Sequence, residues 1–224
     1  MWALTFSWFL RDPIFVRVQL SAEMGICMEK HSHEHSRKSS RSVINGEFFM
    51  EEWGPDKGES MLDLGCGDGF LSIAAAKSIG ATGVVYALDI DRDWLTESEA
   101  AAADQGIDNV RWVCGDATKE IPLERHCVDY VLMTNVLHGF VANLELTAVM
   151  HEVNRILKPG GKLVVVEFKK AVMEYGPPVE IRLKPDEVAS TLGPFGYSLA
   201  HTAMCAVYHH QTTLRRLPPI GNGC

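Results

Sequence analysis

Met61-Leu62-Asp63-Leu64-Gly65-Cys66-Gly67-Asp68-Gly69 is the stretch of sequence that decides the fold. A short apolar run leads into three glycines at alternate positions, typical of a turn after a buried strand where the backbone must approach a ligand without interference from Cβ atoms. Asp89 ends the next apolar run, 22 residues after Gly67, and an acid there suits the hydroxyls of a ribose. Asp116 ends a third apolar run and extends the same site along an adenosine. The pattern therefore predicts a site for a nucleoside-containing cofactor.

The details of the turn favour one cofactor over the alternatives. The dinucleotide fingerprint needs a third glycine where this chain has Phe70, and its glycine falls one residue early, at Gly69. A P-loop is excluded because Gly-Lys occurs at 161–162 alone and is followed by leucine rather than Ser or Thr. Asp63, beneath the turn, would repel a phosphate and attract an ammonium group. S-adenosylmethionine carries an amino group and a ribose but no phosphate, so it is the cofactor that we expect.

These motifs resemble those of the class I S-adenosylmethionine-dependent methyltransferases, and in particular the small-molecule enzymes of ubiquinone and menaquinone biosynthesis. The resemblance covers roughly residues 45–215 and involves five ordered segments, at 62–69, 84–91, 115–117, 129–138 and 155–163. It implies the following cofactor-binding residues: Asp63, Gly65, Cys66, Gly67, Gly69, Asp89, Ile90, Asp116, Ala117 and Asn135.

Alternating apolar runs and helical stretches predict the fold class, α/β with a doubly wound, mostly parallel, seven-stranded Rossmann-like sheet. The expected parallel strands are Met61–Leu64, Val84–Asp89, Val110–Cys114, Val128–Met133 and Leu163–Phe168. The expected helices are Phe70–Ile79, Asp91–Gln105, Leu144–Leu157 and Lys184–Leu192. Tyr197–Ala200 and Cys205–Leu214 are separated by four residues, which is too few for a parallel crossover, so an antiparallel C-terminal hairpin completes the sheet.

Composition and length indicate one domain, and the resemblance implies that it is a methyltransferase domain at 42–215, with an irregular extension before it, at 1–41, and a loose tail after it, at 216–224. The chain has 224 residues, of which 46% are hydrophobic and 22% charged. The apolar run Met1–Leu10 is too short to span a bilayer and lacks the basic residues of a secretory signal, so no stable membrane insertion is expected. Met24 and Met28 offer other start sites; residues 1–27 are thus a misassigned start, an irregular extension or a peripheral anchor.

The net charge indicates which classes of binding partner are unfavourable, and the cysteine spacing indicates the cellular compartment. A formal net charge of −8 without a run of five basic residues does not favour nucleic acid as a partner. The six cysteines show no Cys-x-x-Cys spacing and are expected to be buried, reduced thiols of a cytoplasmic protein, although thiolates holding arsenite remain an alternative. The cluster His31-Ser32-His33-Glu34-His35 is interpreted as a solvated segment, and no metal site is predicted.

His138 is the one candidate for a catalytic side chain. It follows the fourth predicted strand, where a doubly wound fold opens its ligand crevice, and it is either a general base, a hydrogen-bonding group for the substrate, or a packing residue. His209 and His210 alternate along the last strand and are expected to pack on opposite faces of the sheet. No acid–base pair is evident from the sequence. The transfer needs a base for a phenol, hydroxyl or amine, but none for an anionic or soft nucleophile.

Two segments are expected to cover the substrate: Ser42–Trp53 and the long connection Lys169–Arg182, with Glu167 and Lys169 at the mouth of the crevice. The expected function is methyl transfer to a small-molecule acceptor of unidentified structure. The alternative is a cofactor-binding module or partner subunit without transfer activity; a dinucleotide oxidoreductase is a third reading. The sequence does not indicate an oligomeric state.

Overall fold

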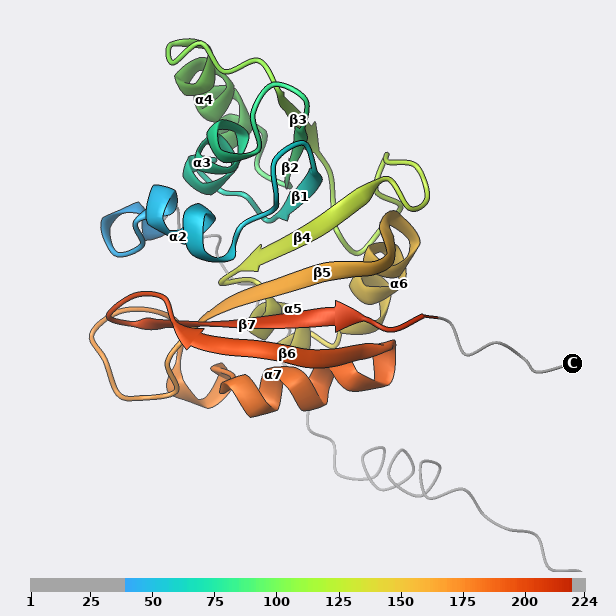
Figure 1. The fold of residues 1–224 in the computed structure, drawn as a ribbon. Coiled ribbons are helices and arrows are strands. Elements are labelled where there is room, and N and C mark those ends of the chain that lie inside the picture. The colour runs from blue at the N-terminus through green and yellow to red at the C-terminus, as the bar shows by residue number, and fades with distance from the viewer. Residues whose placement is uncertain (1–38, 219–224) are drawn as a thin grey trace, which may run out of the picture. The chain divides into compact units, whose positions relative to one another are not determined.

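A computed structural model describes residues 39–218 of the chain, and within them a seven-stranded sheet in the order β3-β2-β1-β4-β5-β7-β6 (Figure 1). β1 to β5 pair in parallel, and β7 is antiparallel to both of its neighbours. The strands are β1 (Ser60–Leu64), β2 (Val84–Asp89), β3 (Val110–Cys114), β4 (Val128–Thr134), β5 (Leu157–Phe168), β6 (Tyr197–Met204) and β7 (His209–Arg216). The predicted doubly wound sheet with an antiparallel C-terminal hairpin is confirmed.

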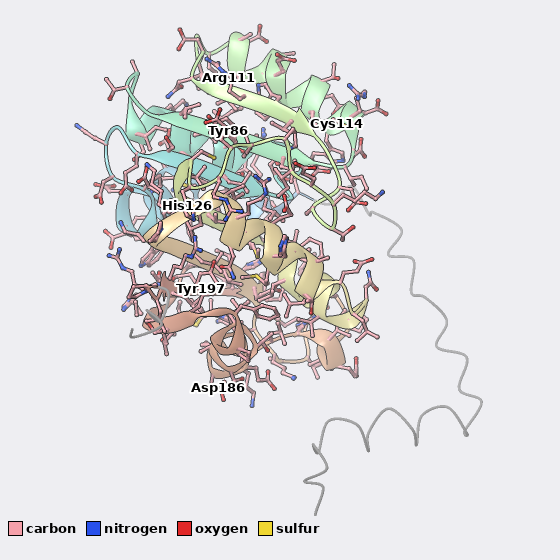
Figure 2. All side chains as sticks on the ribbon, turned by 90° about the vertical axis from the view of Figure 1, so that its right-hand side faces the viewer. Tyr86, Arg111, Cys114, His126, Asp186 and Tyr197 are labelled. Carbon is pink, nitrogen blue, oxygen red and sulfur yellow. The ribbon has the colours of Figure 1, made fainter. Side chains whose placement is uncertain are left out.

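Helices cover both faces of this sheet, as its apolar strands require. One face packs against α2 (Gly46–Trp53), α3 (Phe70–Ile79) and α4 (Arg92–Ala103), and the other against α5 (Leu137–Ala142), α6 (Leu146–Ile156) and α7 (Pro185–Leu192). The short 3-10 helices are η1 (Ser40–Ser42), η2 (Val179–Ile181) and η3 (Gly193–Phe195). Figure 2 looks onto the α6 face, along which the labelled Tyr86, His126 and Tyr197 lie. Alternate residues of each strand therefore enter one of two separate cores.

The structure corrects several details that were expected from the sequence. Leu144 does not begin α6: it has a left-handed φ of 61° and is 80% exposed, while the separate helix α5 precedes it. Both hairpin strands differ from their predicted bounds: β6 continues past Ala200 to Met204, and Cys205–Tyr208 form the turn instead of the start of β7. Cys114 is exposed rather than buried; Cys66 alone among the described cysteines is fully buried. The expectations for residues 1–38, including the His31–His35 cluster and the start at Met24 or Met28, lie outside the described residues.

An ion pair on α6 fixes the connection between β3 and β4. Arg155 donates to the carboxylate of Glu152 at 2.7 Å and to the carbonyl oxygens of Ile121 and Leu123, both at 2.6 Å. Glu152 in turn accepts the N–H of Ile121 at 2.9 Å. This network anchors the loop without any regular backbone pairing. The hydrogen bonds and charge of Arg155 hold the pKa of Glu152 below its usual range.

We expect Arg155→Met to destabilise the fold by about 3 kcal/mol, because it leaves a mostly buried carboxylate without its cation. The side chains of Glu152 and Arg155 are 8% and 17% exposed, so solvent screens the pair little. Urea unfolding of the single variant and of Arg155→Met/Glu152→Gln measures the effect. The double variant should recover part of the loss; equal stability of the single variant and the wild type would show that the loop is anchored by other contacts.

Candidate functional site

The candidate site lies at the carboxyl edge of the parallel strands, where the chain reverses its direction across the sheet. β1 pairs with β2 on one side and with β4 on the other, so successive connections leave in opposite directions. A crevice forms at such a switch point because the two flanking loops diverge. The turn after β1 and the ends of β2, β3, β4 and β5 all meet at this edge.

The glycine turn after β1 has left-handed backbone at Gly65, Gly67 and Gly69, with φ of 76°, 54° and 66°. The three glycines are required for different reasons. A Cβ at Gly65 would lie 2.6 Å from Val136, and one at Gly69 would lie 2.8 Å from Ser98 and Trp112. At Gly67 a Cβ would make an ordinary van der Waals contact, with Trp94 at 3.8 Å. Close packing therefore excludes a side chain at Gly65 and Gly69, whereas at Gly67 the left-handed backbone is the constraint.

Asp89 fastens this turn to the end of β2. Its carboxylate accepts the N–H of Gly67 at 2.8 Å and that of Asp91 at 2.9 Å. The N–H groups of Gly65 and Cys66 donate to the Leu88 carbonyl at 2.8 and 3.0 Å. Each carboxylate oxygen can accept more than one hydrogen bond, so Asp89 can still bind two ribose hydroxyls. Asp89 thus holds the turn in shape and also has carboxylate oxygens that can accept hydrogen bonds from a ligand beside the turn.

Asp63 lies beneath the turn and is 1% exposed. Its carboxylate accepts a 2.6 Å hydrogen bond from the hydroxyl of Ser72 on α3. Burial raises the pKa of Asp63 to about 7; the Ser72 hydrogen bond opposes this effect, and the charge of Asp89 adds to it. A positive group bound at the turn would favour the charged form of Asp63, which agrees with the sign expected for an ammonium ligand.

Two features lie at the ends of β2 and β3. Asp116 stabilises the turn after β3, and Ile90 is an exposed apolar side chain after β2. Asp116 accepts from the N–H and hydroxyl of Thr118 at 2.9 and 2.7 Å, and Lys119 lies 3.1 Å from its other oxygen. These contacts, first that with the Thr118 hydroxyl, lower the pKa of Asp116. Ile90, directly after Asp89, is 52% exposed, and Ala117 is partly buried beside the turn. An apolar wall next to a carboxylate suits the flat face and the polar edge of an adenine.

Asn135 follows β4 in a left-handed conformation, with φ of 57°. Its side-chain nitrogen lies 2.8 Å from Ser40 Oγ and 3.2 Å from Nε2 of His209, so Asn135 links η1 to the start of β7. Arg41, the next residue of η1, forms a 3.2 Å ion pair with Asp68 of the glycine turn. The segment before α2 therefore crosses the crevice from the turn to β4.

His138 and Glu167 form a buried pair that sequence reasoning missed. His138 Nδ1 lies 2.7 Å from one carboxylate oxygen of Glu167, and the His138 backbone N–H donates to the other at 3.1 Å. Glu167 is fully buried, so it does not stand at an open mouth of the crevice as expected. The two residues are 29 apart in the chain, and no spacing rule would have joined them.

Unpartnered buried polar atoms gather beside this pair. Among the described residues, seven buried side-chain atoms lack a hydrogen-bond partner, and six lie at the end of β4 or the start of β7: Thr134 Oγ1, Asn135 Oδ1, His209 Nδ1, His210 Nδ1, Gln211 Nε2 and Thr212 Oγ1. Such groups cost about 1–3 kcal/mol each unless something satisfies them, and they concentrate at functional sites. Burial lowers the pKa of His209 to about 4, so it is neutral near pH 7. This part of the edge therefore suits a ligand with uncharged polar groups.

The loop after β5 is organised around one guanidinium group. Arg182 is 3% exposed and donates to the carbonyl oxygens of Lys169, Ala171, Tyr175 and Pro177 at 2.7–3.1 Å. The same guanidinium lies 5.6 Å from the centre of the Phe168 ring. The predicted covering segment Lys169–Arg182 is thus a folded flap at the end of β5.

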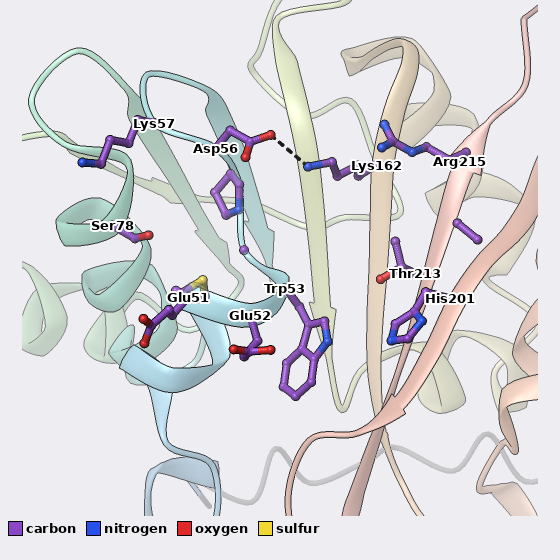
Figure 3. A pocket seen from close by; sticks show the side chains of 14 residues that line it. Glu51, Glu52, Trp53, Asp56, Lys57, Ser78, Lys162, His201, Thr213 and Arg215 are labelled. Atoms are coloured by element: carbon purple, nitrogen blue, oxygen red, sulfur yellow. Dashed lines mark hydrogen bonds and ion pairs between the residues drawn. The ribbon is translucent and has the colours of Figure 1, made fainter.

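A cavity of about 550 Å³ lies elsewhere, on the α2 side of the sheet (Figure 3). Trp53, His201, Thr213 and Arg215 line it, and an ion pair of 3.2 Å between Asp56 and Lys162 crosses it. Lys162 and Arg215 are partners at the edge of the sheet opposite the glycine turn. None of the expected cofactor-binding residues lines this cavity. We therefore take the carboxyl edge, and not this cavity, as the candidate cofactor site.

Two further properties concern residues 39–218 alone. No group of three His, Cys, Asp or Glu side chains in this range is arranged to hold a metal ion. The helices in the same range are too short or too polar to span a bilayer.

Comparison with known proteins adds independent information. A sequence model of the methyltransferase domain matches residues 55–208. The demethylmenaquinone methyltransferase of Staphylococcus aureus (strain MRSA252) is 36% identical over 128 residues, which are 55% of this chain and 49% of that protein. The chain therefore spans about half the length of the curated relatives that it matches.

Solved structures with the same fold include proteins of different chemistry. A SAM dependent methyltransferase from Aquifex aeolicus superposes with a TM-score of 0.71 at 25% identity, over 81% of this chain and 95% of its own. The [4+2]-cyclase SpnF superposes with a TM-score of 0.62 at 17% identity, over 77% of this chain and 79% of its own. The likeness to the cyclase shows the fold alone.

Substitutions at Gly67 and Gly69 should separate ligand binding from stability. Gly67→Ala should cost only the roughly 1–2 kcal/mol of a left-handed alanine, yet weaken binding of S-adenosylhomocysteine at least about tenfold, because it strains the backbone that is proposed to contact the ligand. Gly69→Ala should add overpacking of about 1–3 kcal/mol against Trp112. Urea unfolding and isothermal titration of both variants test this. Wild-type affinity in Gly67→Ala would mean that the turn does not face the ligand.

Proposed function

Because the chain belongs to the methyltransferase domain family, we propose that it transfers a methyl group from S-adenosylmethionine to a small-molecule acceptor. The observation that carries the proposal is the left-handed glycine turn fastened to Asp89 at the carboxyl edge of the sheet. The resemblance to the Aquifex aeolicus methyltransferase along almost the whole of that chain supports it.

The residues at the carboxyl edge fit each part of this cofactor. Asp89 would accept from the ribose hydroxyls, and Ile90 and Asp116 would contact the adenine. Asp63 would balance the positive charge at the turn from below. The bound cofactor supplies an electrophilic methyl group. What the chain contributes is position: it holds the acceptor atom in line with that methyl group and excludes water.

The acceptor would occupy the half of the edge formed by β4, β5 and β7. Neutral polar side chains gather there, including Asn135, His209 and Gln211. The segment at Ser40–Arg41 crosses this region, and the flap held by Arg182 borders it. An uncharged ring compound with polar oxygen substituents suits such a surface, and the demethylmenaquinone methyltransferase relatives make quinone precursors the first class to test. We place the reaction in the cytoplasm, because the described cysteines are free thiols.

The competing function is cofactor binding without transfer, since the likeness to SpnF shows that the fold alone does not establish a reaction. A screen with labelled S-adenosylmethionine over quinone precursors, thiols, metalloids and small phenols separates the two. Transfer to any member supports the proposal. Binding of S-adenosylhomocysteine without transfer throughout would favour the alternative, and binding of NAD in its place would overturn both.

We expect Asp89→Ala to weaken the binding of S-adenosylhomocysteine by about 10- to 150-fold. The loss corresponds to roughly 1.5–3 kcal/mol for hydrogen bonds to a charged group. Isothermal titration measures the affinity, and Asp104→Ala, at an exposed acid after α4, is the matched control. Asp89→Asn should fall between the two, since an amide keeps one acceptor oxygen. An unchanged dissociation constant in folded Asp89→Ala would remove the ribose assignment.

A further inference from the structure

We infer that the cavity beside Trp53 is a second ligand site, and that its ligand is a planar aromatic compound with one carboxylate group. The inference goes beyond the proposed function, because the cavity lies at the opposite edge of the sheet from the glycine turn and its occupation needs no methyl transfer. Three features of the lining carry it: two cations that face each other across neighbouring strands, an aromatic ring, and a balance of fixed charges.

The cavity opens onto the face of β5, β6 and β7 that α7 does not cover. Leu214 of β7 packs in the core with Val188 and Leu192 of α7, so its neighbours Thr213 and Arg215 point to the other face. Thr213 and Arg215 therefore line the cavity from the sheet, and the end of α2 borders it from the other side (Figure 3). A ligand in the cavity would lie between the sheet and the end of this helix.

Two cations of the lining stand side by side. Lys162 of β5 and Arg215 of β7 are directly opposite each other in the antiparallel register. Such side chains have Cβ atoms about 4.5–5.5 Å apart, and like charges at these positions destabilise a sheet. Asp56 offsets the charge of Lys162 only in part, through a 3.2 Å ion pair in which the aspartate is 80% exposed. An anion bound between the two cations would relieve their repulsion.

The guanidinium group of Arg215 determines which anionic group fits. Arg215 is exposed, and one of its terminal nitrogens donates to the carbonyl oxygen of Gly160 at 3.3 Å. The planar fork has further N–H donors, which bind a carboxylate through two parallel hydrogen bonds. Thr213 and His201, which are partners across β6 and β7, add polar groups beside it. The sheet side of the cavity therefore suits a carboxylate.

Trp53 provides a flat apolar surface for the rest of the ligand. Its ring packs against Phe48 and Phe49, with centroids 5.8 and 5.4 Å apart, at the margin of the core around α2. These contacts limit the orientations of the ring, and an aromatic ligand can stack on the part that lines the cavity. The volume of about 550 Å³ is within the range of small-molecule sites, about 300–1,000 Å³.

The fixed charges of the lining limit the ligand to one negative charge. Three acids and three bases line the cavity, so their formal charges cancel: Glu51, Glu52, Asp56, Lys57, Lys162 and Arg215. A single carboxylate is matched by Arg215. A phosphate ester would bring a second negative charge close to the acids at the end of α2, which disfavours it.

Isothermal titration of the full chain with 2-naphthoate tests the inference. We expect the wild type to bind this probe with a dissociation constant below about 1 mM. 2-Naphthalenemethanol has the same ring system without the charge, and 2-naphthyl phosphate is mostly dianionic near neutral pH. Both controls should bind at least about tenfold more weakly than 2-naphthoate. Equal binding of the alcohol would overturn the carboxylate assignment, and equal binding of the phosphate would overturn the limit of one charge.

Variants of the lining identify the site. Arg215→Gln should weaken the binding of 2-naphthoate at least about fivefold, and Arg215→Lys less, because lysine keeps the charge without the planar fork. Trp53→Leu should weaken it to a similar extent through the loss of stacking. Arg111→Gln is the matched control and should bind as the wild type does, since Arg111 is also an exposed strand arginine that donates to a backbone carbonyl, that of Asp108 at 3.0 Å. Thermal melting shows that each variant is folded.

Asp56→Asn should change the affinity in the opposite direction. The substitution removes the carboxylate that competes for Lys162, so 2-naphthoate should bind about two- to fivefold more tightly. Asp56 is mostly exposed, so the fold should tolerate the change. Affinity equal to or below that of the wild type would contradict the position of the ligand carboxylate between the two cations.

NMR of ¹⁵N-labelled protein locates the bound probe. The largest shifts on addition of 2-naphthoate should fall on the Trp53 indole N–H and on the amides of His201, Thr213 and Arg215. Shifts concentrated at Gly65–Gly69 would place the probe at the carboxyl edge and overturn the inference. The absence of binding to the wild type, or wild-type affinity in Arg215→Gln, would overturn it as well. None of these outcomes depends on whether S-adenosylmethionine is the cofactor.

Discussion

The hydrogen bond from the Gly67 N–H to the Asp89 carboxylate is the interaction on which the rest of the site depends. It joins the turn after β1 to the end of β2, beside the two N–H groups that donate to Leu88. Three left-handed glycines at alternate positions make this turn possible, and two of them also admit Val136, Ser98 and Trp112 at close range. The acid that is proposed to bind ribose is therefore the same group that holds the turn in shape.

The charges along the carboxyl edge divide it into two halves. Asp63, Asp89 and Asp116 stand at or near the ends of β1, β2 and β3, where a cofactor with an ammonium and a sulfonium group would lie. The other half, at β4, β5 and β7, has neutral polar groups and a histidine of lowered pKa, His209. The carboxylate of Glu167, at the end of β5, is bound to His138. The proposed positive cofactor and neutral acceptor would thus each meet matching surroundings.

The sequence predicted the parts of the structure that local patterns determine. The bounds of β2, β3 and α3 agree with expectation to the residue, because Gly, Asp and short apolar runs mark both of their ends. The order of motifs also predicted the sheet and the family. It did not predict the His138–Glu167 pair, since the contact arises where β4 and β5 happen to end together. The sequence also could not predict that Arg182 holds the loop after β5 together. Its four partners are backbone carbonyls, which every residue has and no sequence pattern marks. Leu144 was misplaced because its apolar side chain fits a helical period, although it is exposed in a left-handed turn.

The central claim is that S-adenosylmethionine binds at the carboxyl edge, over the glycine turn and Asp89. Titration of ¹⁵N-labelled protein with S-adenosylhomocysteine, followed by NMR, tests it most directly. The account predicts that the largest amide shifts fall on Gly65–Gly69, Asp89–Asp91 and Asp116–Thr118. Shifts confined to the cavity beside Trp53 and Arg215, or no shifts at millimolar ligand, would contradict it.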